Sequence, residues 1–125
     1  MKSLVLKKCN NCGALVEVIK DCNCDNCGIM CCDAQMSEVK SNNKDFAFEK
    51  HIPTYKKLGD QIEVSVNHDM TEEHYIEWLM LVADDVQIKK QLTIGSPAKA
   101  TFPYIKGAKI YSYCNKHGLW ESVVE

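Results

Sequence analysis

The hydrophobic pattern of the chain changes near its middle, and the second half consists of short apolar segments separated by polar turns. Residues 61–66, QIEVSV, alternate apolar and polar positions with the period of two that is typical of a half-buried strand. Similar segments follow as HYIEWLMLVA, VQIKKQLTI, KATFPY, AKIYSYC and LWESVV. Turn-forming residues separate them at Asp84–Asp85, Gly95–Pro97, Ile105–Gly107 and Lys116–Gly118. This pattern predicts an all-β fold, an antiparallel sandwich or barrel.

One segment allows a second interpretation. TEEHYIEWLML could form an amphipathic helix, but Tyr75, Ile76 and Trp78 favour a strand. We predict that Trp78 and Trp120 belong to the core of the sandwich.

The first part of the chain has too few large apolar residues for a core of its own. Residues 1–37 contain few large apolar residues, among them Leu4, Val5, Leu6, Leu15, Val16, Val18 and Ile19. A domain of this size needs a further source of stability besides its apolar core, and we expect a structural metal to supply it. The polar segment EVKSNNKD, residues 38–45, resembles a linker. We therefore predict two domains, residues 1–37 and 38–125.

Composition and charge exclude several functional classes. The chain has 125 residues, 46% hydrophobic and 26% charged, with a formal net charge of −2, so a globular protein is expected. Nucleic-acid binding requires a basic face, which this charge does not favour. The apolar part of MKSLVLKKCN is too short for a signal peptide, and no segment is long enough to span a membrane. We expect a cytoplasmic protein whose cysteines serve as metal ligands rather than in disulfides.

Cysteine and histidine are unevenly distributed. Seven of the eight cysteines lie in the first 32 residues, and all four histidines follow residue 50. A single histidine is usually a surface or core residue. Together, however, the four histidines and Cys114 favour a metal site, since Cys114-x-x-His117 lets two side chains of one turn reach the same ion. The candidate ligands are His51, His68, His74, Cys114 and His117.

Three of these segments resemble a known family. EKHIP, HDMTEEHYIEW and YCNKHGLW resemble the superoxide reductase motifs of the desulfoferrodoxin and neelaredoxin family. CNNCG and the later CC resemble the desulforedoxin-like N-terminal domain of the same family. The resemblance extends from Cys9 to Trp120. It implies an immunoglobulin-like β-sandwich preceded by a small metal-stapled domain.

The resemblance also implies roles for individual residues. A mononuclear iron, cycling between Fe2+ and Fe3+, would have Cys114 as its axial thiolate and an open sixth position. Its equatorial ligands would be His51, His68, His74 and His117. Lys50 would attract superoxide, and Glu49 would occupy the sixth position after oxidation. The chain departs from the family at Asn67 and Asp69, where prolines are usual; Asp69 adds a negative charge that would slightly disfavour superoxide.

Two ligand sets compete for the N-terminal centre, which would hold a second iron or a zinc. Spacing alone favours Cys9 and Cys12 with Cys24 and Cys27, because both pairs are C-x-x-C-G turns. The resemblance instead favours Cys31 and Cys32 as the second pair. Adjacent cysteines in a strand point to opposite faces, so this second choice requires a distorted backbone.

If Cys9, Cys12, Cys31 and Cys32 bind the metal, three N-terminal thiols remain, and they have several possible roles. Cys22, Cys24 and Cys27 would be a replacement ligand set, a further metal site, a redox pair or unligated cysteines. The sequence leaves these four possibilities open.

The resemblance predicts a superoxide reductase, which reduces superoxide by one electron to hydrogen peroxide and is reduced again by a rubredoxin-like donor. It also implies a homodimer. Two alternatives remain: a non-catalytic electron-transfer or iron-binding protein, and a zinc-ribbon interaction module.

Overall fold

The computed structural model describes residues 3–25, 27–44 and 51–125. These residues form strands and loops, and no helix occurs among them. Nothing in the described part of the chain is a helix of the length and apolarity needed to cross a membrane. Contacts divide the chain into a small unit, Leu4–Lys40, and a larger unit that comprises Ser41–Glu125 with Ser3.

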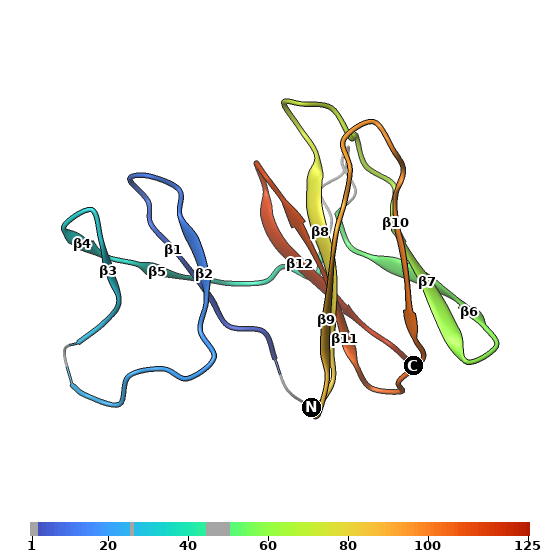
Figure 1. Ribbon diagram of the computed structural model, residues 1–125, viewed down its shortest axis with the longest axis horizontal. Coiled ribbons are helices and arrows are strands. Elements are labelled where there is room, and N and C mark those ends of the chain that lie inside the picture. Colours follow the sequence, from blue (N-terminus) through green and yellow to red (C-terminus); the bar gives the residue numbers. More distant parts are fainter. Residues whose placement is uncertain (1–2, 26, 45–50) are drawn as a thin grey trace. The chain divides into compact units, whose positions relative to one another are not determined.

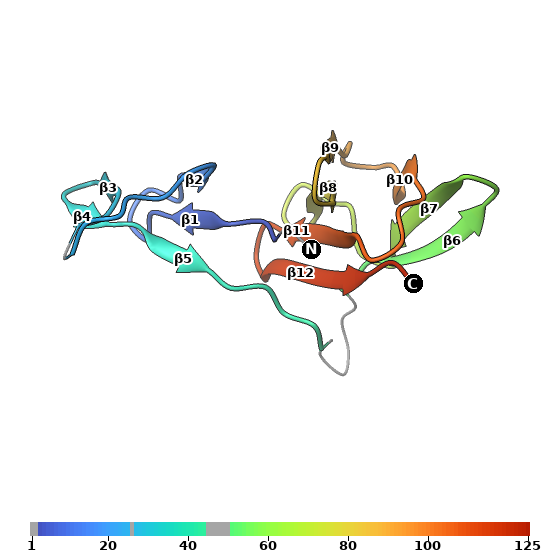
Figure 2. The same ribbon diagram turned by 90° about the horizontal axis from the view of Figure 1, so that it is seen from below.

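The larger unit contains two antiparallel sheets (Figures 1 and 2). One sheet has the order β10-β7-β6 and consists of Ala98–Pro103, Gln61–Val66 and Thr54–Leu58. The other has the order β12-β11-β8-β9 and consists of Gly118–Val123, Lys109–Cys114, Ile76–Val82 and Gln87–Gln91. The prediction of an all-β fold is confirmed, and the segment that could have been a helix contains a loop followed by strand β8 from Ile76.

The core of the larger unit is formed by the facing sides of these two sheets. Strand β7 buries alternate residues, as its sequence pattern predicts. Most side chains of the core cluster come from β7, β8, β10 and β11, and they include Ile62, Val64, Leu79, Leu81, Phe102 and Ile110. Trp78 is also buried, and its ring is stacked on that of Tyr113 with centroids 5.4 Å apart. Burial of apolar surface of this extent is the main stabilising contribution to such a fold.

Strand β6 has no clear signal in the sequence. Its residues TYKKL are mostly exposed, because β6 is the edge strand of its sheet and pairs only with β7. Gly59, with a φ of 66°, allows the tight turn that joins the two strands.

The small unit contains a three-stranded sheet and a short hairpin. The sheet has the order β2-β1-β5, with strands Leu15–Glu17, Leu6–Lys8 and Ser37–Val39. The hairpin joins β3, Met30–Cys31, to β4, Ala34–Gln35.

The start of the sequence-predicted linker belongs to the small sheet. Glu38 pairs with Lys7, and Val39 pairs with Leu6, so β5 extends beyond the predicted boundary at residue 37. The small unit accordingly continues to Lys40. The polar composition of this segment concealed the strand, because only Val39 among its three residues is even partly buried.

Candidate metal centres

His51 is held in place by two neighbours in the four-stranded sheet. The hydroxyl of Ser112, on β11, donates a hydrogen bond of 2.5 Å to the backbone carbonyl of His51. The ring of His51 is stacked on that of Trp120, on β12, with centroids 4.6 Å apart and an angle of 13° between the planes. His51 and Trp120 are both buried. Trp120 is therefore a core residue, as predicted, and it also orients a candidate ligand.

His68 and His74 lie on the loop that joins β7 to β8. Within this loop, the backbone N–H and the hydroxyl of Thr71 each donate to the carbonyl of His74. Asn115 then ties the end of the loop to the neighbouring turn: its side-chain oxygen accepts from the N–H of Tyr75 at 2.9 Å. Its side-chain N–H group donates to the carbonyl of Glu73 at 3.0 Å.

Cys114 and His117 lie on the turn between β11 and β12. Cys114 is the last residue of β11 and pairs with Gly118, whose φ of 82° favours glycine at this turn. The indole N–H of Trp120 donates to the carbonyl of His117 at 3.1 Å, which fixes the turn from within β12. The thiol of Cys114 is fully buried.

These three segments bring the candidate ligand atoms together. Nδ1 of His117 lies 3.1 Å from Nε2 of His51, 3.3 Å from Nε2 of His74 and 3.8 Å from Sγ of Cys114. The four residues form one cluster whose donor atoms all lie within 4.8 Å of one another. His68 adjoins it, with Nε2 3.6 Å from Sγ of Cys114.

Asp69 contacts two of the histidines. Its carbonyl oxygen lies 2.7 Å from Nδ1 of His68; since a carbonyl only accepts, Nδ1 is the donor in this contact. Its carboxylate lies 3.9 Å from Nδ1 of His74. From the sequence, Asp69 was expected only to add a negative charge that disfavours superoxide.

The donor set fits a first-row transition metal. Imidazole nitrogen and thiolate sulfur are ligands for iron and zinc, whereas calcium and magnesium prefer oxygen. Glu49 and Lys50, the other predicted site residues, lie outside the described part of the chain.

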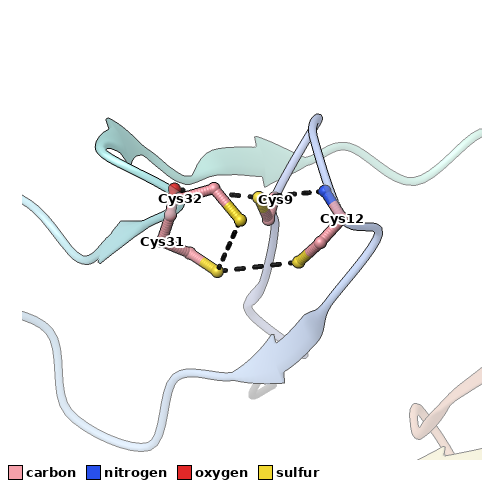
Figure 3. Close-up of side chains that lie close together, drawn as sticks. All are labelled: Cys9, Cys12, Cys31 and Cys32. Carbon is pink, nitrogen blue, oxygen red and sulfur yellow. Dashed lines mark hydrogen bonds between the residues drawn. The ribbon is translucent and has the colours of Figure 1, made fainter.

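The small unit contains a second cluster, formed by Cys9, Cys12, Cys31 and Cys32 (Figure 3). Its sulfur atoms also lie within 4.8 Å of one another; Sγ of Cys31 is 3.7 Å from that of Cys12 and 3.9 Å from that of Cys32. Cys32 has a φ of 54° and the following Asp33 a φ of 61°. This left-handed conformation at the β3–β4 turn lets both adjacent thiols face the same side, which an extended strand does not permit.

Protonation of the cysteines reflects this crowding. The backbone N–H of Cys12, followed by that of Asn11, stabilises the thiolate of Cys9 and lowers its pKa to about 6. The thiol of Cys31 shares hydrogen bonds with Cys12, Cys9 and Cys32 in that order of strength, which raises its pKa to about 12. One thiolate therefore forms readily at neutral pH, and a cation held by the cluster would replace the proton of Cys31.

The remaining N-terminal thiols form a separate cluster. Cys22, Cys24 and Cys27 lie within 4.8 Å of one another, and Cys24 is joined to Cys27 by a disulfide. The structure thus groups Cys9 and Cys12 with the adjacent pair Cys31 and Cys32, and not with the second C-x-x-C turn.

Comparison with known proteins shows similarity to one family. Residues 43–123 match the family model of desulfoferrodoxin. A desulfoferrodoxin from Syntrophotalea carbinolica is 38% identical over 125 residues, covering 97% of each chain.

Solved structures show the same similarity. The superoxide reductase from Treponema pallidum has the same fold, with a TM-score of 0.71, 24% identity and coverage of 96% of this chain and 98% of the other. A superoxide reductase from Giardia intestinalis is 30% identical, with a TM-score of 0.54 and coverage of 62% and 98%.

The fold and the histidine–cysteine cluster define a non-haem metal protein of the all-β class. The chain belongs to the desulfoferrodoxin family.

A first prediction concerns the buried hydroxyl beneath His51. Ser112→Ala leaves the His51 carbonyl without its donor and should lower the free energy of unfolding by about 1–2 kcal/mol. Denaturant unfolding of the metal-free protein measures this loss. Ser122→Ala, which removes the partly buried hydrogen bond to the Pro53 carbonyl, is the matched comparison and should cost less. Equal stability of Ser112→Ala and the unmodified chain would contradict the assigned role.

A second prediction separates the two N-terminal ligand sets. Cys31→Ser should reduce the metal content of the small unit because it removes a sulfur from the four-thiol cluster, whereas Cys24→Ser should leave it unchanged. Metal analysis after native purification gives the stoichiometry of each variant. The opposite pattern would assign the centre to the two C-x-x-C turns.

Proposed function

We propose that this protein is a superoxide reductase, which converts superoxide to hydrogen peroxide by one-electron reduction. The observation that carries this proposal is the convergence of one buried thiol and several imidazoles, from three separate segments, on one point. Membership of the desulfoferrodoxin family supports it, as does similarity to the superoxide reductase from Giardia intestinalis.

The residues that would hold the iron follow from the cluster geometry. Nε2 of His51, His68 and His74, Nδ1 of His117 and Sγ of Cys114 are the donor atoms that face one another. Iron, when bound, supplies the electron that reduces superoxide, and two protons complete hydrogen peroxide. Five protein donors would leave one position of a six-coordinate ion for the substrate, which would distinguish a catalytic site from a closed one.

The chemical types of the ligands suit an anionic substrate. Neutral imidazoles add no negative charge, so the site keeps most of the positive charge of the ion and attracts superoxide. The thiolate of Cys114 donates electron density, which stabilises the oxidised metal after electron transfer. Burial of Cys114 keeps its sulfur away from water and from competing reactions.

The two residues that precede His51 in the sequence complete the proposed site. Lys50 supplies local positive potential that guides superoxide toward the site despite the slightly acidic net charge. Glu49 supplies a carboxylate for the sixth position in the oxidised protein. Both assignments rest on the EKH segment of the sequence.

The N-terminal centre has a different role. Four thiolates around one ion leave no position for a substrate, so Cys9, Cys12, Cys31 and Cys32 form a closed centre. With iron it relays or stores an electron, and with zinc it only stabilises the small unit. A rubredoxin-like electron donor, a homodimeric assembly and a cytoplasmic location complete the proposal.

The proposal is tested by replacing the thiolate. Cys114→Ser should abolish the sulfur-to-iron charge-transfer absorption of the oxidised protein and greatly slow the oxidation of the reduced protein by superoxide. Absorption spectra and rapid mixing with superoxide measure the two effects. If the spectrum of Cys114→Ser is unchanged, Cys114 is not a ligand. If the reduced unmodified protein does not react with superoxide, superoxide reductase activity is excluded and an electron-transfer function is favoured.

The role of Lys50 predicts a dependence on salt. Lys50→Ala should slow the reaction with superoxide most at low ionic strength, because screening already weakens the attraction at high salt. Lys89→Ala, an exposed lysine on β9, is the matched control for the loss of one positive charge. Rate constants measured over a series of salt concentrations compare the two variants. Equal rates for Lys50→Ala and Lys89→Ala at every salt concentration would exclude a steering role.

A further inference from the structure

The loop between β2 and β3 carries three thiols that neither metal centre uses. Strand β2 ends at Glu17 and β3 begins at Met30, and Figure 1 shows the segment between them as a long loop beside the small sheet. Cys22, Cys24 and Cys27 are all exposed on this loop. Their sulfur atoms lie within 4.8 Å of one another, so any two are close enough to react.

The structure distinguishes Cys24 and Cys27 from the other cysteines by the direct contact of their sulfur atoms. Cys24 and Cys27 are joined by a disulfide, with Cα atoms 5.8 Å apart, a separation within the usual range for such a bond, while the other six cysteines form no disulfide. The four-thiol cluster already has a full set of ligands for one ion without Cys24 and Cys27. The disulfide therefore does not take ligands from the metal centre.

A purely structural role does not suit this disulfide. The bond joins residues only three positions apart, so it closes a very short loop and restricts the unfolded chain little. Both cysteines are exposed and lie outside the strands, so the bond does not fasten one sheet to another. Their exposure instead gives small oxidants and reductants access to both sulfur atoms.

The start of the loop is anchored, which keeps the third thiol nearby. The carboxylate of Asp21 accepts hydrogen bonds from the N–H of Cys22 at 2.8 Å and from the side chain of Lys7, on β1, at 3.4 Å. The same oxygen accepts a weaker one from the thiol of Cys22 at 3.5 Å. Cys22 is thereby held beside Cys24 and Cys27, where its thiol can attack their disulfide and exchange partners.

We propose that Cys24 and Cys27 are a redox-active dithiol site that hydrogen peroxide oxidises and a dithiol reductant restores. The source of peroxide rests on the proposed function, of which hydrogen peroxide is the product. The site consumes one peroxide for each disulfide formed. It is distinct from both metal centres in its residues and in its two-electron chemistry.

The reaction balances without any further reactant. One thiolate attacks peroxide, an S–O bond forms as the O–O bond breaks, and the released hydroxide takes a proton to give water. The second thiol then attacks this sulfur, an S–S bond forms, the S–O bond breaks, and a second water leaves. Two sulfurs are oxidised by one electron each, and two oxygens are reduced by one each. A dithiol reductant reverses the change by two exchange steps and becomes a disulfide itself.

The test uses the metal-loaded full chain, reduced with dithiothreitol and then freed of reductant without air. One equivalent of hydrogen peroxide should remove two alkylatable thiols per chain, and dithiothreitol should restore them. Cleavage before aspartate separates Cys24 from Cys27, because Asp25 lies between them. Mass spectrometry should therefore find the two resulting peptides, residues 21–24 and 25–32, joined by a disulfide.

Variants identify the partner sulfurs. Cys27→Ser should lose the cross-linked peptide pair, whereas Cys22→Ser, the matched control in the same loop, should retain it. The proposal is overturned if Cys24 and Cys27 stay alkylatable after peroxide, or if Cys24→Ser/Cys27→Ser loses as many thiols as the parent. It is also overturned if the reduced loop binds an extra equivalent of zinc that protects all three thiols.

Peroxide is added directly in this test, so its outcome does not depend on whether the chain produces peroxide. Failure of the proposed function would appear separately, in the reaction of the reduced iron with superoxide.

Discussion

The turn between β11 and β12 is the constraint on which the histidine–cysteine site depends. It places Cys114 and His117 on one side of a tight connection, with Gly118 in a left-handed conformation. Trp120 holds this turn through the His117 carbonyl, and its ring is stacked on His51. Asn115 fastens the turn to the loop that carries the other two histidines. Ligands from distant parts of the chain therefore meet because one short segment contacts all of them.

The small unit has few apolar side chains, so its stability depends on other interactions. Its thiols lie on two tight turns, and the left-handed backbone at Cys32 and Asp33 brings adjacent thiols to one side. Such a conformation is strained for non-glycine residues, and a cation bound by the four thiolates would offset this strain. Metal binding would then be coupled to folding of the small unit, whereas the larger unit has an extensive apolar core.

The sequence predicted the strands best where burial alternates, as in β7, or where a long apolar segment forms a central strand, as in β8. It did not predict β6 or the extension of β5, because exposed edge strands carry little hydrophobic signal. The grouping of histidines with Cys114 was expected from spacing and resemblance. The contacts of Asp69 and Trp120 with the histidines were not expected. Residues that support a candidate ligand are positioned by loop geometry, which leaves no pattern in the sequence.

The central claim is that this site reduces superoxide rather than dismutating it. Its most direct test is the product stoichiometry when superoxide is generated in the presence of the iron-loaded protein and an excess of electron donor. The account predicts one hydrogen peroxide for each superoxide consumed and no dioxygen. One peroxide for every two superoxide ions, with release of dioxygen, would contradict it.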